Sequence, residues 1–174
     1  FHTGGAKINN TPQIRCVFEF PDNVSLAEKF SPPLIIDSTY REGTFRKEAA
    51  KKNKAILVYE GGESMRFDYT AINEGVNGCL RLMKSYNMLN IDVPNNHGVK
   101  IKKDTWIRAN ISGLFHMNAS NGAYVNKDDL LGVICNPFGN IEHKILSTVD
   151  GYVVGINNQP VVNQGDALIH LGME

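Results

Sequence analysis

The pattern of hydrophobic and polar positions divides the chain into two stretches of different texture. In residues 13–89, short apolar runs alternate with helical patterns, and the runs predict strands over 13–20, 33–37 and 55–60. Continuously apolar runs of this length are typical of strands that helices cover on both faces. The alternation of strands and helices therefore predicts an α/β layer structure.

Helices are predicted between and after these runs. A short helix is expected over 25–30 and a longer one over 44–53, with Thr44 as its N-cap. The clearest helix, near 69–86, follows the N-cap candidate Asp68. Its apolar residues recur at helical spacing and predict one continuous buried face, made of Ile72, Val76, Cys79, Leu80 and Met83.

The second stretch predicts a small β-domain. A turn-rich linker is expected over 91–104, between an α/β part over 1–90 and a β-part over 105–174 that contains no long helix. The β-part holds a quasi-repeat, because a glycine-led strand and a following Val-Asn segment occur twice. The two copies begin at Gly113 and Gly151. They predict two similar β-units related by pseudo-symmetry.

The quasi-repeat resembles the barrel-sandwich-hybrid pattern of biotinyl and lipoyl domains. In carrier domains of that type, a modified lysine lies at the hairpin between the two halves. The corresponding segment here, 136–140, contains no lysine, and Lys144 lies beyond it. We therefore reject a lipoyl or biotin carrier and expect a structural or substrate-covering role for the β-part.

Composition excludes several classes of function. Lys plus Arg and Asp plus Glu both number 18, so the formal charge is zero, which disfavours binding to nucleic acid or to a membrane surface. No apolar run approaches the ~20 residues that a transmembrane helix needs. Three cysteines lie far apart without a CxxC pair, which indicates a reducing, cytoplasmic compartment.

Two short segments carry candidate chemistry. His2 precedes the pair Gly4-Gly5, where the backbone can approach a ligand closely. Glu60 ends the strand predicted over 55–60, and the carboxyl ends of strands are where α/β proteins build their sites. Taken singly, a histidine near a chain end is commonly a surface residue, and a strand-end glutamate is commonly a cap or an ion-pair partner.

The order of short motifs narrows these alternatives. A series of short motifs precedes a glycine-containing helix: His2-Thr3-Gly4, Asn10-x-Pro12-x-Ile14-Arg15, Ser31 to Ser38, Arg41 to Arg46 and Tyr59 to Asp68. Over essentially the whole chain, this order resembles the C-terminal half of the succinylglutamate desuccinylase/aspartoacylase family, relatives of the zinc carboxypeptidases. The resemblance implies part of a zinc carboxypeptidase-like α/β sheet followed by a small all-β, barrel-sandwich-hybrid-like domain.

The resemblance also implies a function. It suggests a zinc-dependent amide hydrolase, a deacylase that acts on an N-acyl amino acid or a similar small amide. His2 matches the family's third zinc ligand and Glu60 its general base, so we expect the two side chains to point toward each other. Arg46 matches an arginine that binds a substrate carboxylate, although a solvated arginine on a basic helix stays an alternative.

Part of the family's machinery is absent from these residues. The first two zinc ligands, in an H-x-x-E arrangement, do not occur, and the chain opens on Phe1 without a secretory signal. We therefore expect an upstream segment that supplies them, and no tight zinc binding by the present residues alone. The remaining histidines lack ligand spacing and are interpreted as surface or packing residues: His97, His116, His143 and His170.

A second hypothesis belongs to another class of function. A non-catalytic relative could use the β-part for binding or oligomerisation, and a homo-oligomer stays open under either hypothesis. Glu63, Arg66 and Asp68 are expected to serve as turn, ion-pair and cap residues. The motif order favours the hydrolase, with a small N-acyl molecule as its partner.

Overall fold

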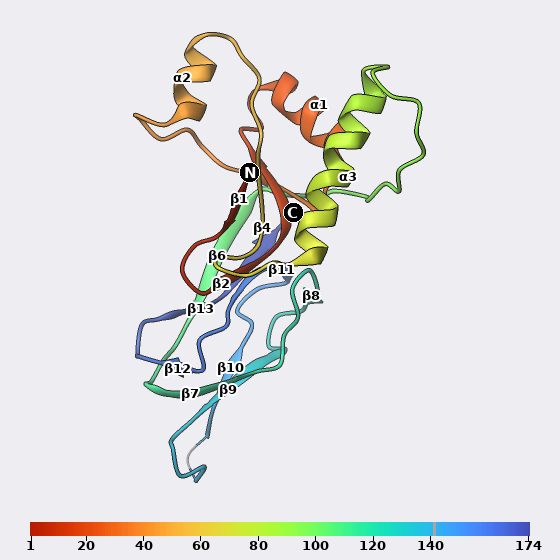
Figure 1. Cartoon of the computed structure of the whole chain (residues 1–174). Coiled ribbons are helices and arrows are strands. Elements are labelled where there is room, and N and C mark those ends of the chain that lie inside the picture. The colour runs from red at the N-terminus through yellow and green to blue at the C-terminus, as the bar shows by residue number, and fades with distance from the viewer. Residues whose placement is uncertain (141) are drawn as a thin grey trace.

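The computed structural model describes residues 1–140 and 142–174, and their strands form two sheets (Figure 1). The nine-stranded sheet contains β1 (His2–Gly4), β2 (Ile8–Cys16), β3 (Leu34–Asp37), β4 (Val58–Glu63), β5 (Val99–Ile101), β6 (Lys103–Arg108), β8 (Tyr124–Val125), β11 (Gly151–Asn157) and β13 (Ala167–Met173). The four-stranded sheet contains β7 (Gly113–Met117), β9 (Leu130–Cys135), β10 (Glu142–Leu146) and β12 (Val161–Val162). The helices are α1 (Pro21–Phe30), α2 (Phe45–Lys51) and α3 (Tyr69–Ser85). The predicted α/β character is confirmed.

Strand β2 joins the two halves of the chain. Along one edge it pairs antiparallel with β4, and along the other it pairs with β11 near Asn10 and then with β3 from Gln13 onward. The path β1-β4-β2-β11-β13-β6 is therefore one continuous sheet. One face of this sheet can carry side chains from both the α/β part and the β-part.

The helices α1 and α3 cover the opposite face of the sheet at its α/β end, as Figure 1 shows. Ile14, Phe30 and Tyr59 form the core between them. Gly78 of α3 lies against the Phe30 ring, so closely that a Cβ there would overlap it, and Gly75 lies against Tyr59. Both glycines serve close packing, since any larger side chain would push α3 away from the layer below.

The buried face of α3 differs from the predicted one. Of the predicted residues, Cys79 packs partly buried against the core, but Ile72 and Val76 are 43% and 54% exposed. The buried positions are Ala71, Gly75, Gly78 and Arg81. The close approach of the small residues decides which side of the helix meets the sheet, and hydrophobicity alone does not reveal it. The predicted cap is confirmed, because Asp68 Oδ1 accepts a hydrogen bond from Ala71 N at 3.1 Å.

Two strands are displaced from their predicted positions. β4 begins at Val58 and continues through Glu63, because Gly62 pairs with β2 and Glu63 pairs with β1. Glu60 therefore lies inside the strand rather than at its carboxyl end. β2 begins earlier than predicted and stops at Cys16, since α1 already starts at Pro21, whose fixed φ suits the first turn of a helix.

The β-part has the predicted pseudo-symmetry. β8, from the first copy of the repeat, pairs with β11 of the second, and β12 of the second pairs with β7 of the first. Each copy also closes the same turn: Asp129 accepts from Asn126 N and Asp166 accepts from Asn163 N, both at 2.8 Å. Among the described residues after Ser85 there is no helix, as predicted.

The stretch predicted as a linker contains a strand. Residues 99–101 form β5, which pairs in parallel with β3, and the following strand β6 begins at Lys103. Within the predicted linker, residues 91–98 and Lys102 lack helix and strand. Because the composition around β5 is polar and turn-rich, the sequence pattern did not indicate this strand of three residues.

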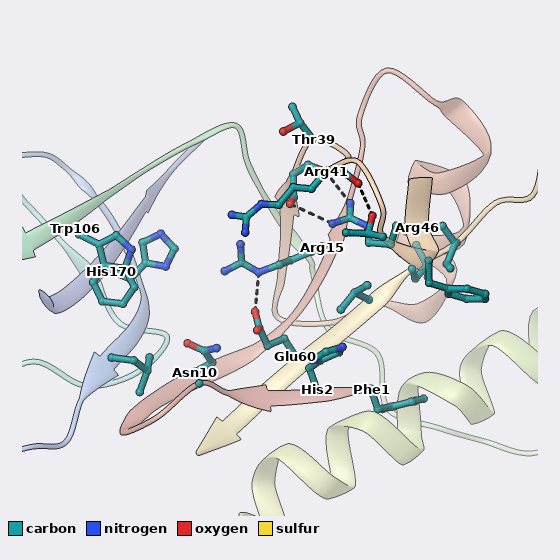
Figure 2. A pocket seen from close by; sticks show the side chains of 18 residues that line it. Phe1, His2, Asn10, Arg15, Thr39, Arg41, Arg46, Glu60, Trp106 and His170 are labelled. Atoms are coloured by element: carbon teal, nitrogen blue, oxygen red, sulfur yellow. Dashed lines mark hydrogen bonds and ion pairs between the residues drawn. The ribbon is translucent and has the colours of Figure 1, made fainter. Parts of the chain in front are cut away.

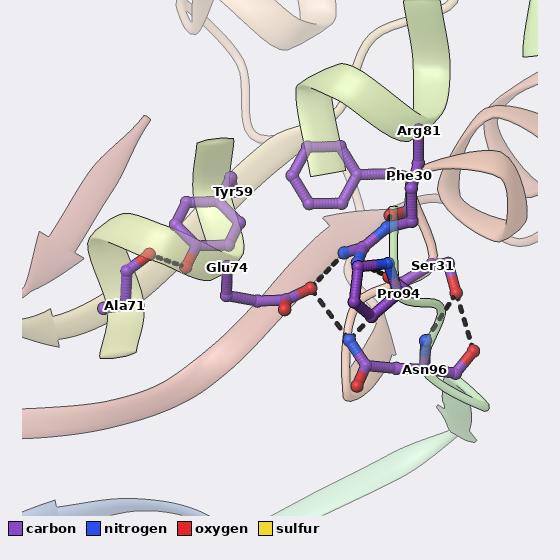
Figure 3. A network of polar contacts seen from close by, with 8 residues as sticks. All are labelled: Phe30, Ser31, Tyr59, Ala71, Glu74, Arg81, Pro94 and Asn96. Carbon is purple, nitrogen blue, oxygen red and sulfur yellow. Dashed lines mark hydrogen bonds and ion pairs between the residues drawn. The ribbon is translucent and has the colours of Figure 1, made fainter. Parts of the chain in front are cut away.

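A buried ionic network fixes this connecting segment (Figure 3). Arg81 is 4% exposed; its Nε donates to Phe30 O at 2.7 Å and its guanidinium also donates to Pro94 O at 2.5 Å. The same guanidinium pairs with Glu74, which accepts a further hydrogen bond from Asn96 Nδ2 at 2.9 Å. Arg81 thus ties α3 to the end of α1 and to the segment that leads into β5.

Cys16, Cys79 and Cys135 are free thiols, and burial raises the pKa of Cys16 to about 12.

Each helix in the described part of the chain is too short or too polar to cross a membrane.

Candidate active site

Three polar side chains form a row across neighbouring strands. His2 of β1 and Glu60 of β4 are register partners in a parallel pair, and Gln13 of β2 is the antiparallel partner of Glu60. Register partners project from the same face of a sheet, and alternation sends Tyr59 to the opposite face, into the helix-covered core. The structure therefore brings His2 and Glu60 to one face of the sheet.

The Glu60 carboxylate is held in place from β2. Arg15 Nε donates to Glu60 Oε2 at 2.7 Å, and Gln13 Nε2 donates to the same oxygen at 3.0 Å. No hydrogen bond from the described residues reaches Oε1. With side chains 24% and 20% exposed, Arg15 and Glu60 form a partly buried pair at the wall of a cavity. One carboxylate oxygen is fixed and the other is available to a ligand.

The cavity has a volume of about 810 Å³ and lies on the face of the sheet opposite α1 and α3. His2, Glu60 and Arg15 form part of its floor, the segment 38–46 lines one side, and Trp106 and His170 of the β-part line the other (Figure 2). Its charged lining consists of one carboxylate and three guanidinium groups, those of Arg15, Arg41 and Arg46. This excess of positive charge suits an anionic ligand.

Arg46, the predicted substrate-carboxylate residue, lines the cavity from α2. Its guanidinium donates to Ser38 O at 2.7 Å and to Ser38 Oγ at 3.3 Å, and it lies 5.4 Å from the centre of the Tyr40 ring. Burial lowers the pKa of Arg46, although an arginine stays charged at neutral pH. Its buried Nε has no hydrogen-bond partner in the described residues.

His170 of β13 lines the cavity from the β-part. The sequence predicts only a surface or packing residue, and in the structure His170 is 4% exposed. Its ring stacks on Trp106 of β6, with centroids 4.5 Å apart and planes 6° from parallel. Burial lowers the pKa of His170, and Asp104 opposes that shift. His97, His116 and His143, by contrast, are exposed, as expected.

The position of His170 in the cavity follows from strand pairing. Trp106 and His170 are register partners on β6 and β13, so their rings meet across two strands that are distant in sequence. Arg15 was missed for the same reason, because it meets Glu60 only through the pairing of β2 with β4. His170 belongs to none of the short motifs, and Arg15 ends the motif Asn10-x-Pro12-x-Ile14-Arg15 without a role that the motif alone assigns.

The side chains of the candidate site can supply one ligand to a catalytic zinc ion. His2 offers one exposed imidazole, whereas Oε2 of Glu60 is already bonded to Arg15 and Gln13. Within residues 1–140 and 142–174, no three His, Cys, Asp or Glu side chains gather as a metal site would require. A complete zinc site therefore needs donors beyond those described.

Comparison with known proteins identifies the fold. No protein-family model and no curated protein sequence matches the chain. Among solved structures, the ectoine utilization protein EutE (DoeB) from Ruegeria pomeroyi matches with a TM-score of 0.84 at 16% identity, covering 99% of this chain and 58% of that one. A succinylglutamate desuccinylase/aspartoacylase from Rhodobacter sphaeroides matches with a TM-score of 0.78 at 19% identity, covering 99% and 56%. An aspartoacylase family protein from Mesorhizobium loti gives 0.76 at 15%, covering 98% and 60%.

These matches confirm the recognised resemblance at the level of the fold. The chain has the fold of succinylglutamate desuccinylase/aspartoacylase proteins. It spans a little over half the length of the solved structures that it matches.

Proposed function

We propose that the chain is part of a zinc-dependent amide hydrolase that removes the acyl group from an N-acyl amino acid or a similar small amide. The observation that carries the proposal is the row of His2, Glu60 and Gln13 on the floor of a cationic cavity. The names of the matched structures, succinylglutamate desuccinylase and aspartoacylase, describe amide hydrolases and support the reaction class. The proposal includes a carboxypeptidase-like sheet and a barrel-sandwich-hybrid-like β-part.

His2 is the residue proposed to hold the zinc ion, together with ligands from outside the described residues. Zinc held there would supply Lewis-acid chemistry, lowering the pKa of water toward ≈ 7 and polarising the scissile carbonyl. Glu60 is proposed to accept the proton of the attacking water on Oε1 and to return it to the leaving amine. Arg15 and Gln13 serve this role by fixing Oε2, which sets the orientation of the carboxylate.

The zinc assignment is tested by metal content. We expect about one zinc per chain after dialysis of the protein together with any residues that precede Phe1, and a loss of most of it in His2→Ala, because one of three protein ligands is removed. His116→Ala is the matched control, since this histidine is exposed on β7 and does not line the cavity. Unchanged zinc in His2→Ala, or no zinc in either protein, would favour a non-catalytic binding module.

The role of Arg46 has its own test. Lysine keeps the positive charge of Arg46 but cannot form the paired hydrogen bonds that a guanidinium makes with a carboxylate. We therefore expect Arg46→Lys to raise KM for an N-acyl amino acid about tenfold while kcat changes less than about threefold. Lys52→Ala, an exposed residue at the end of α2, is the control in steady-state assays. A lower Tm with an unchanged KM would instead assign Arg46 to holding the segment around Ser38.

A further inference from the structure

One side of the candidate active site is apolar. Val58 of β4, Ile56 just before this strand and Phe45, the first residue of α2, line the cavity that contains Glu60. Figure 2 shows Arg46, the next residue of α2, across the cavity from the β-part. The cavity therefore has an apolar wall on the side of the helix α2.

The apolar wall begins directly beside Glu60. Val58 and Glu60 are two positions apart on β4, so both side chains project from the same face of the sheet. Val58 is also the register partner of Arg15, whose Nε donates to the Glu60 carboxylate. A substrate whose amide meets Glu60 can therefore place an adjoining group against Val58 and extend it toward α2.

Phe45 contributes little to the packing of the protein. The helix α2 buries none of its residues in the described structure, and Phe45 is 80% exposed, whereas Ile56 and Val58 are half-buried. An apolar ring at the wall of a cavity differs in meaning from an isolated one such as Phe138, which is 86% exposed and does not line this cavity. Contact with an apolar ligand would remove the Phe45 ring from water, which is favourable.

The cavity is large enough to hold such a ligand. Its volume of about 810 Å³ lies within the range of ≈ 300–1,000 Å³ that is typical of pockets for drug-sized molecules. A substrate with a short acyl group and a short side chain would leave Phe45, Ile56 and Val58 in contact with water. The dimensions and the lining thus favour a substrate that carries a large apolar group.

We propose that Phe45, Ile56 and Val58 form an apolar subsite that receives a large apolar group of the substrate, either the hydrocarbon chain of the acyl group or the side chain of the amino acid. The inference rests on the proposed function, because the subsite is placed relative to the scissile amide at Glu60. It adds a preference for apolar substituents to the attraction for anions that the arginine residues of the cavity provide.

Two series of substrates test the subsite and identify the group that occupies it. The acyl series consists of N-acetylalanine, N-butyrylalanine and N-hexanoylalanine, and the side-chain series of N-acetylalanine, N-acetylnorvaline and N-acetyl-2-aminoheptanoate. Burial of one methylene group corresponds to a factor of about three to four. We expect kcat/KM to rise at least ~10-fold from the shortest to the longest member of one series. A flat response in both series would overturn the subsite.

Variants of the lining residues separate recognition from structure. Phe45→Ala removes an exposed ring, so Tm should change little, while kcat/KM is expected to fall at least ~5-fold for the longest member of the responding series and less than ~2-fold for N-acetylalanine. Val58→Thr keeps the shape of the side chain but adds a hydroxyl group, and the same selective loss is expected. Phe138→Ala is the matched control and should change neither value. Equal losses for the longest and the shortest substrate in Phe45→Ala would contradict the subsite.

A binding measurement separates this inference from the proposed function. If the unmodified protein hydrolyses no member of either series, the proposed function fails, and the subsite is then tested by calorimetry with octanoate and butyrate, which carry the same charge. We expect octanoate to bind at least ~10-fold more tightly than butyrate, and this ratio to fall below about threefold in Phe45→Ala. Equal affinities for the two acids in the unmodified protein refute the subsite.

Discussion

Replacing Glu60 with glutamine is expected to lower kcat for amide hydrolysis at least ~10²-fold, which corresponds to about 2.7 kcal/mol of transition-state stabilisation. Glutamine keeps the size of the side chain and can still accept hydrogen bonds from Arg15 and Gln13, which now meet Oε2. An amide oxygen cannot take the proton of the attacking water, so the chemical step is lost while the site keeps its shape. Steady-state kinetics measures the change.

Glu63→Gln is the matched control for this prediction. Glu63 lies three residues further along β4 and accepts from Asn158 Nδ2 at 2.7 Å, but it does not line the cavity of Glu60. Its substitution should therefore cost far less activity. Metal content should be equal in both variants, because neither residue is assigned as a ligand. Near-normal turnover in Glu60→Gln would overturn its assignment as the general base.

The sequence predicted that His2 and Glu60 lie near each other, but it did not indicate which residue contacts Glu60. His2 and Glu60 were expected to approach each other, and they are register partners on parallel strands. The residue that holds Glu60, Arg15, is 45 positions away in the chain. Its role depends on the register between β2 and β4, and a shift by one residue would send Arg15 to the other face. No composition or spacing rule reveals that register.

The fold shows the same division between local and long-range information. The cap at Asp68 follows from chemistry within one turn of helix, and the structure has it where the sequence placed it. The extent of β4 depends on its partners: the sequence predicts that the strand ends at Glu60, yet pairing with β1 and β2 extends it through Gly61 and Gly62 to Glu63. Glycine is permitted in a strand wherever neighbouring backbones or side chains approach closely.

The predicted buried face of α3 was wrong at Ile72 and Val76 for a third reason. Helical periodicity assumed that the largest apolar residues are the buried ones, but Ile72 and Val76 are exposed while Gly75 and Gly78 meet the core. The same buried face carries Arg81, a residue that a hydrophobic pattern would place at the surface. A charged residue at a buried position is costly unless it is fully paired, so its partners determine how much stability depends on it.

Arg81→Met is expected to lower the free energy of unfolding by about 3–5 kcal/mol, because it leaves the Glu74 carboxylate with little exposure and no cation. The carbonyl groups of Phe30 and Pro94 also lose their donors. Urea denaturation measures the change, and adding Glu74→Leu to Arg81→Met should recover part of it. Lys84→Ala, which breaks the exposed pair with Asp92, is the control and should cost at most about 1 kcal/mol. Equal small losses in Arg81→Met and Lys84→Ala would contradict a clamp between α1, α3 and the segment leading into β5.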